Sequence, residues 1–294
     1  MIPVIIGMTI VVFLLLHLSP GDPVDLIAGP RATPETIENI KINLGLDKPL
    51  IVQYFKFLIN LFKGDLGTSI LQQRPVTTII KEALPVTIEL GLASIIVSFF
   101  IALPLGIMAA VHRNTWKDYA SMSGALVAMS LPTFWLGLML IYFFAYKYRW
   151  FPVSGYGTWK HLVLPLIAIS LTGIAINARM IRSSMLEVIR QDYIRTARSK
   201  GLPEKVVIRG HALKNALIPV VTMLGLRIGW IIGGSVITEI IFARPGVGRL
   251  MVNAIYARDY PVVQGAMVVL TASIIIGNMI ADILYIILDP RIKY

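Results

Sequence analysis

The chain has 294 residues, 56% of them hydrophobic, and carries a formal net charge of +11. A soluble domain of this length would not be so apolar, so the composition favours a membrane protein with basic loops over a nucleic-acid-binding protein. The absence of cysteine excludes disulfides, thiol catalysis and cysteine-ligated metal sites.

The first charge-free stretch covers residues 1–18, which contain no Lys, Arg, Asp or Glu. This length is just sufficient to cross a bilayer, so we expect a first transmembrane helix here. A cleaved signal peptide is the alternative, although the segment lacks a basic start and a small-residue cleavage site. The turn cluster of residues 19–23, Ser-Pro-Gly-Asp-Pro, is then expected to end the span.

The next stretch, residues 19–85, has balanced charge, with seven basic and seven acidic residues. The triplet Thr33-Pro34-Glu35 predicts the start of a short helix, and Gly45 its end. Apolar residues at helical spacing predict a second helix that ends at Gly64 and a third that ends before Pro85. We therefore expect an extracytoplasmic helical subdomain over residues 19–85.

Five further stretches are apolar and long enough to cross a membrane, namely residues 90–111, 119–146, 161–178, 216–238 and 260–281, the last extending to 288. With the first helix they make six spans, which places both termini on one side. The inner segments would then carry thirteen Lys and Arg residues, and the two short outer loops six. Because positive charge favours the inner side, both termini, including residues 289–294, are expected in the cytoplasm.

Three residues in or beside these spans stand out as candidates for a pathway or a subunit interface. Pro132 interrupts the centre of the third span, where neighbouring helices can tolerate a kink. Arg227 lies about midway along the fifth span, and a charge facing lipid is costly. We expect Arg227 to face protein or a water-filled path, with a polar or acidic partner. Glu239 is about 18 Å away along a straight helix, too far for a direct pair.

The most informative segment is the basic loop of residues 179–219, which holds nine Lys and Arg residues against three acids. Gly201 is suited to end one helix and Pro203 to begin another. An apolar stripe at helical spacing precedes this turn, at Leu186, Ile189, Tyr193 and Ala197. A charge anchor for topology or a nucleic-acid-binding helix-turn-helix would explain the charge. The turn and the stripe favour a docking element for a cytoplasmic partner.

Motifs for chemistry are absent from the sequence. It has no G-x-x-x-x-G-K phosphate loop, so it cannot bind ATP in that way, and it has no H-E-x-x-H or G-x-S-x-G motif. The spans hold no chain of Asp, Glu and His that could relay protons. An energy-coupled transporter of this kind would need another subunit to supply the energy.

The basic loop resembles the coupling loop of bacterial ABC importer permeases, most closely the dipeptide, oligopeptide and nickel branch. The resemblance rests on residues 192–202, Asp-Tyr-Ile-Arg-Thr-Ala-Arg-Ser-Lys-Gly-Leu, and on residues 211–219, His-Ala-Leu-Lys-Asn-Ala-Leu-Ile-Pro. The general importer motif begins Glu-Ala-Ala, where this chain has Arg195-Thr196-Ala197, and Gly201 matches the glycine of that motif. The missing glutamate is usual in the peptide branch. Residues 20–23, 239–250, 258–265 and 289–294 also resemble this branch.

The resemblance implies an all-α, polytopic inner-membrane protein with the type I ABC importer permease fold, in which residues 86–288 form the transmembrane core. It implies a heterodimer with a second homologous permease, two cytoplasmic ATPases that bind ATP and Mg, an extracytoplasmic substrate-binding protein and surrounding lipid. Nucleic acid is not an expected partner. The chain itself is expected to be no enzyme and to hold no cofactor. The expected substrates are dipeptides or oligopeptides, with nickel or metal chelates, or a secondary transporter, as alternatives.

The resemblance also assigns roles within the loop. Tyr193, Ala197 and Leu202 are expected to enter a groove of the ATPase. Arg195 and Arg198 are expected to pair with acidic groups at its rim, and Gly201 to adopt a positive φ.

Overall fold

The computed structural model describes residues 6–11, 13–14, 33, 35, 38, 41–42 and 47–288. The predicted all-α class is confirmed over these residues, where the one β-type contact is an isolated bridge between Thr68 and Pro75. Residues 6–11 and 13–14 of the predicted first span are helical. The rest of that span, the turn at 19–23, Pro34, Gly45 and residues 289–294 lie outside the described residues.

The chain divides into two compact units, one of Met1–Thr87 with Pro245–Ala272 and one of Ile88–Arg244 with Ser273–Tyr294. In the first unit, α4 (Leu50–Phe62) confirms the predicted second helix, and Gly64 has a φ of +75° just after it. The helix α14 (Val247–Tyr256) packs with the start of α5 and α15 around a cluster that includes Val76, Ile80, Ala254 and Val262.

A buried carboxylate fixes the loop that precedes α5 in the first unit. Asp259 accepts hydrogen bonds from the Ser69 hydroxyl and from the backbone N–H groups of Ile70 and Leu71. Because Asp259 directly precedes α15, these bonds attach residues 69–71 to the start of that helix.

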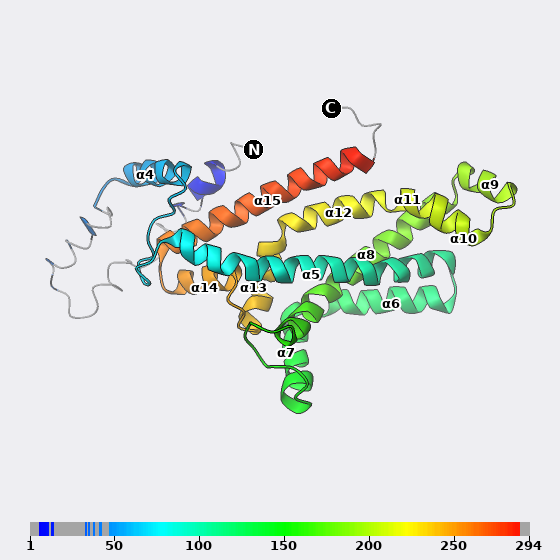
Figure 1. The fold of residues 1–294 in the computed structure, drawn as a ribbon, viewed down its shortest axis with the longest axis horizontal. Helices are drawn as coiled ribbons and strands as arrows, with labels where there is room; N and C mark the ends of the chain where they lie inside the picture. The colour runs from blue at the N-terminus through cyan, green and yellow to red at the C-terminus, as the bar shows by residue number, and fades with distance from the viewer. Residues whose placement is uncertain are drawn as a thin grey trace. The chain divides into compact units, whose positions relative to one another are not determined.

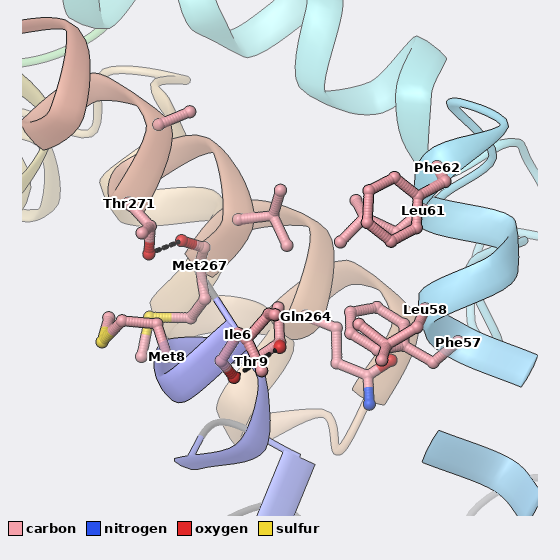
Figure 2. A pocket seen from close by; sticks show the side chains of 12 residues that line it. Ile6, Met8, Thr9, Phe57, Leu58, Leu61, Phe62, Gln264, Met267 and Thr271 are labelled. Atoms are coloured by element: carbon pink, nitrogen blue, oxygen red, sulfur yellow. Dashed lines mark hydrogen bonds between the residues drawn. The ribbon is translucent and has the colours of Figure 1, made fainter. Parts of the chain in front are cut away.

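The first unit also contains an apolar pocket of about 250 Å³. Figure 2 shows Met8 and Thr9 from the N-terminal helical residues, Leu58 and Leu61 from α4, and Met267 on α15 around it. The Thr9 hydroxyl donates to the Ile6 carbonyl at 2.8 Å and the Thr271 hydroxyl to the Met267 carbonyl at 2.9 Å, so both hydroxyls bond to backbone of their own helices.

The prediction of a separate third helix ending before Pro85 is wrong. A single helix, α5 (Val76–Val111), runs through Pro85 and Pro104. A proline removes only one backbone hydrogen bond, and packing along the remaining helix offsets that loss.

The second unit contains α6 (Trp116–Ser130), α7 (Thr133–Leu140) with the π-helical η1 (Ile141–Lys147), α8 (Lys160–Ile189), α12 (Ile218–Gly229) and α13 (Ile231–Ile241). The helix α8 lies against α6 and α7 (Figure 1). Its buried residues Ile181 and Met185 belong to a cluster that also contains Ala102 of α5 and Val207 of the basic loop.

Among the described residues, three helices are long and apolar enough to cross a membrane: α5, α8 and α15 (Tyr260–Leu288). Two bent helix pairs raise this number to five if each pair forms one span. The count of six spans therefore stays a prediction.

The third span was expected to be one kinked helix, but it is broken by a bend of 95° between α6 and α7–η1. Leu131 is extended, with φ −81° and ψ 121°. The ring of Pro132 disfavours helical geometry at the residue before it, so the break falls at Leu131–Pro132.

The fifth span is also not continuous, because α12 ends at Gly229 and α13 begins at Ile231. A Cβ atom on Gly277 of α15 would lie 2.1 Å from the Gly229 nitrogen, so the two backbones are in direct contact. Gly229 is the last residue of α12, and the weak helix propensity of glycine favours a helix end at this position.

Candidate functional site

Beyond the end of α8, the basic loop forms four short helical segments: α9 (Asp192–Ser199), α10 (Glu204–Val206), η2 (Val207–Ala212) and α11 (Leu213–Ala216). Figure 1 shows α9 and α10 projecting beyond α8. The expected continuous stripe from Leu186 to Ala197 is wrong, because the chain turns at Arg190 and Gln191. The turn lets α9 fold against η2, so tertiary packing overrides the local helical pattern.

The turn after α9 confirms the predicted geometry. Gly201 has a φ of +75°, and α10 begins directly after Pro203. Across the turn, Arg198 donates two hydrogen bonds to Glu204, at 3.1 and 2.7 Å. These bonds lower the pKa of the Glu204 carboxyl below its ordinary value. Arg198, expected to reach a partner's acid, is thus already paired within the loop.

The inner face of α9 is covered by the chain itself. Ile194 is fully buried and Ala197 is 6% exposed, and both belong to the cluster that contains Val207 and Ala212. Ala197, expected to enter an ATPase groove, instead packs inside its own subunit. A small residue at this position allows α9 and η2 to approach each other closely.

The side of the basic loop that faces solvent presents apolar groups and the cation Arg195. Tyr193, Leu202 and Val206 are exposed large hydrophobic residues, with Tyr193 at 42%. Arg195 is also exposed and lies 3.7 Å from Asp192 in a solvent-accessible pair of little energetic weight. The Asn215 amide donates a 2.7 Å hydrogen bond to the Tyr193 hydroxyl, which joins α9 to the end of α11. We call Tyr193, Arg195, Leu202 and Val206 the exposed face of the basic loop.

A buried ion pair near this loop was not found from the sequence. Asp118, at the start of α6, accepts hydrogen bonds from Arg182 of α8 at 2.6 and 2.8 Å, and another from the Asn114 backbone N–H at 3.1 Å. In the sequence, Arg182 stands out only as one of nine loop cations. No local spacing links it to Asp118, which lies 64 residues earlier.

A second buried cation lies at the end of α13. Arg244, counted in the sequence as an outer-loop charge, is 1% exposed. It donates to the Glu89 carboxylate at 2.9 Å and to the His161 carbonyl at 3.2 Å, and it lies over the Tyr156 ring. Its contacts make it part of the packing of the second unit.

The three pathway candidates occupy different environments. Arg227 is partly buried and lines a pocket of about 250 Å³ in the second unit. Glu239 is fully buried in α13, where it accepts a 2.8 Å hydrogen bond from Ser235. Pro132 is exposed at the start of α7 and does not line the pocket, although the next residue, Thr133, does. The structure therefore does not bring the three together.

Other residues of this pocket were missed, but a signal for them exists in the sequence. Arg227, Trp230, Ile231 and Gly234 all line it and follow the i, i+3, i+4, i+7 pattern of one helical face. Reading that pattern outward from the lone charge would have found the face that Arg227 shares.

Comparison with known families covers almost the whole chain. Residues 102–294 match the family described as "Binding-protein-dependent transport system inner membrane component". Residues 1–91 match the N-terminal model of the corresponding membrane component.

Similar proteins match along their full lengths. A dipeptide transport system permease protein of Alkalihalophilus pseudofirmus is 44% identical over 322 residues, which cover 100% of this chain and 97% of the relative. A glutathione transport system permease protein of Pectobacterium atrosepticum is 42% identical over 294 residues, covering 100% and 96%.

A solved structure of the MetNI methionine ABC transporter, in an inward-facing conformation, shares the fold. Its TM-score is 0.63 at 19% identity, and the match covers 72% of this chain and 96% of the solved chain. Together with the apolar helices, these matches show that the chain belongs to the inner-membrane permease family of binding-protein-dependent ABC importers.

Proposed function

We propose that this chain is a permease subunit that carries dipeptides or oligopeptides across the inner membrane. The observation that carries the proposal is the full-length similarity to a dipeptide transport system permease protein. The relative named for glutathione transport points to the same chemical class, since glutathione is itself a short peptide.

The energy for transport would come from partner subunits. Two cytoplasmic ATPases would bind ATP and Mg, and a second homologous permease would complete the pathway. An extracytoplasmic binding protein would deliver the peptide. The exposed face of the basic loop supports this arrangement, because exposed apolar groups together with Arg195 suit an apolar groove with an acidic rim.

The test is reconstitution of the co-purified complex in lipid vesicles. We expect the second permease and the ATPases to co-purify, and uptake of a radiolabelled dipeptide to require both ATP and the binding protein. Uptake driven by an ion gradient without ATP would indicate a secondary transporter. ATP-dependent uptake of nickel but not of peptides would identify a metal importer.

We further propose that the basic loop and both termini face the cytoplasm. The chain has no cysteine, so single cysteines at Thr158 and Ser199, both exposed, would be unique labels. An impermeant outside reagent should label only Thr158→Cys in intact cells. Outside labelling of Ser199→Cys would contradict the orientation.

A further inference from the structure

The pocket of the second unit contains a cation, Arg227, to which no role has yet been given. Arg227 lies near the end of α12, and its Nη1 atom lies 2.5 Å from where a Cβ atom on Gly173 of α8 would be. A Cβ atom there would also lie 3.0 Å from the Cβ of Ser98 on α5. The guanidinium therefore occupies space that exists because position 173 has no side chain.

Within the part of the chain that the structure describes, this guanidinium has no counter-ion. Among the described residues, Arg227 makes no hydrogen bond and no ion pair, so the acidic partner expected from the sequence is not found there. Glu239, the acid closest in sequence, is buried against Ser235 of α13. An ionised residue within a transmembrane region needs a partner or water, which makes Arg227 a candidate ligand-binding group.

The pocket walls provide both polar and apolar groups. Thr133 of α7 and Thr172 of α8 line it, and within the described residues their hydroxyls form no hydrogen bond. Ser94 donates to the Gly91 carbonyl at 2.7 Å, so its oxygen can still accept a bond. Trp230, 64% exposed, and Ile237 supply an open apolar wall.

These groups suit a ligand with a carboxylate close to an apolar side chain. A guanidinium binds a carboxylate through two parallel hydrogen bonds, and the low polarity around it strengthens them. Free hydroxyls can bond to a peptide group, and an indole face accepts an apolar or aromatic side chain. The C-terminal residue of a peptide combines all three features.

We propose that Arg227 binds the C-terminal carboxylate of the peptide in transit, while Trp230 and Ile237 contact its last side chain. This inference rests on the proposed function, since it assumes that peptides pass through the second unit. Thr133 and Thr172 then hydrogen-bond to the terminal peptide group. The permease would thereby select free acids in addition to any selection by the binding protein.

The experiment compares uptake of L-Ala-L-Phe with uptake of L-Ala-L-Phe amide by the complete complex in phosphatidylethanolamine and phosphatidylglycerol vesicles. Each peptide is supplied at a concentration that saturates the binding protein, so that its own preference does not enter. Wild type should transport the acid about tenfold faster, in line with a charge-assisted hydrogen bond. In Arg227→Gln the two rates should agree within about twofold, because the acid rate falls. Arg227→Lys should lie between.

A second variant moves the guanidinium without removing its charge. Gly173→Ala places a methyl group 2.5 Å from Nη1 and 3.0 Å from the Ser98 Cβ, so the flexible arginine must shift away. We expect this variant to lose part of the acid preference. Gly124→Ala in α6, where a Cβ atom would meet nothing within 4 Å, should keep the wild-type ratio.

The outcomes separate the two proposals. If wild type shows no ATP-dependent uptake of either peptide, the proposed function fails and this inference fails with it. If uptake occurs but Arg227→Gln keeps the wild-type ratio of acid to amide, the inference alone is overturned. Loss of the second permease from purified Arg227→Gln, with an unchanged ratio in Arg227→Lys and Gly173→Ala, would assign Arg227 to the subunit interface instead.

Discussion

The basic loop and the helix contacts of the second unit use charge and glycine in opposite ways. In the loop, the Arg198–Glu204 pair is largely exposed and Gly201 provides a turn in open space. Between the helices, Asp118 is almost fully buried with Arg182, and Gly277 touches the backbone of α12. The same residue types therefore shape a surface in one region and fix helix packing in the other. Substitutions between the helices should accordingly reduce stability much more than substitutions in the basic loop.

The largest effect is expected at the glycine contact between α12 and α15. Gly277→Val would place Cβ about 2 Å from the Gly229 backbone, and backbone cannot move aside as a side chain can. We expect a loss above about 4 kcal/mol, enough to remove the protein from the membrane fraction.

Gly124→Ala is the matched control for this contact, because position 124 is helical but open. It should be neutral or slightly stabilising, since alanine has the higher helix propensity. Membrane abundance and the melting temperature of the purified complex measure both variants. A stable Gly277→Val protein would show that the two helices do not touch.

The next largest effect should follow from breaking the buried ion pair. Asp118→Ala leaves Arg182 without its acid, and we expect a loss of about 3 kcal/mol, the low end of the range because Arg182 is partly exposed. Glu82→Gln removes one side of the exposed Arg74–Glu82 pair and should lower the melting temperature far less, because solvent screens both groups. Equal melting temperatures for the two variants would contradict the difference between buried and exposed pairs.

A smaller effect on stability but a clear one on function is expected at Gly201. Valine at a φ of +75° costs about 1–2 kcal/mol, and relief of that strain would redirect α10. Gly201→Val should stay in the membrane but lose ATPase co-purification or peptide-stimulated ATP hydrolysis. Gly210→Val, at an exposed position without positive φ, should retain both.

The competing explanation, charge anchoring alone, makes the reverse prediction for this loop. Gly201→Val would then be harmless, and loss of several arginines would be harmful. Normal coupling in Gly201→Val would therefore reject the docking role of the loop.

The smallest effect should come from the Arg198–Glu204 pair. A double-mutant cycle with Arg198→Gln and Glu204→Gln should give a coupling energy below about 1 kcal/mol, because solvent screens both groups. The pKa of Glu204 is lowered, so this contribution is present above the ordinary carboxyl pKa and is lost as pH falls through the lowered value. Melting of the four proteins at neutral and acidic pH measures it, and coupling that grew on acidification would contradict the sign.

These differences also explain which parts of the structure could be predicted from the sequence. The turn at Gly201 and Pro203 depends on local backbone preferences, and the sequence locates it correctly. The break at Gln191 carries no glycine or proline and results from packing of Ile194 and Ala197 on η2. Local patterns locate an apolar face, but they do not say whether the chain itself or a partner covers it.

Within the spans, prediction from the sequence also fails where tertiary packing decides the structure. Pro85 and Pro132 carry the same chemistry, yet α5 continues through the first while the chain turns sharply at the second. The Asp118–Arg182 pair and the gap at Gly173 join segments far apart in the sequence. The lone charge of Arg227 was recognisable, whereas the residues opposite it on α5, α7 and α8 required the tertiary structure.

The packing of α9 on its own subunit has a kinetic consequence. Ordering a residue's backbone costs roughly 1–2 kcal/mol of entropy, and for α9 that ordering precedes any encounter with a partner. Association of the loop should then need no folding step, so its rate would depend on diffusion and on long-range attraction to the exposed cations. Such a rate falls as ionic strength rises, while the dissociation rate, governed by contacts of Tyr193 and Leu202, should change little.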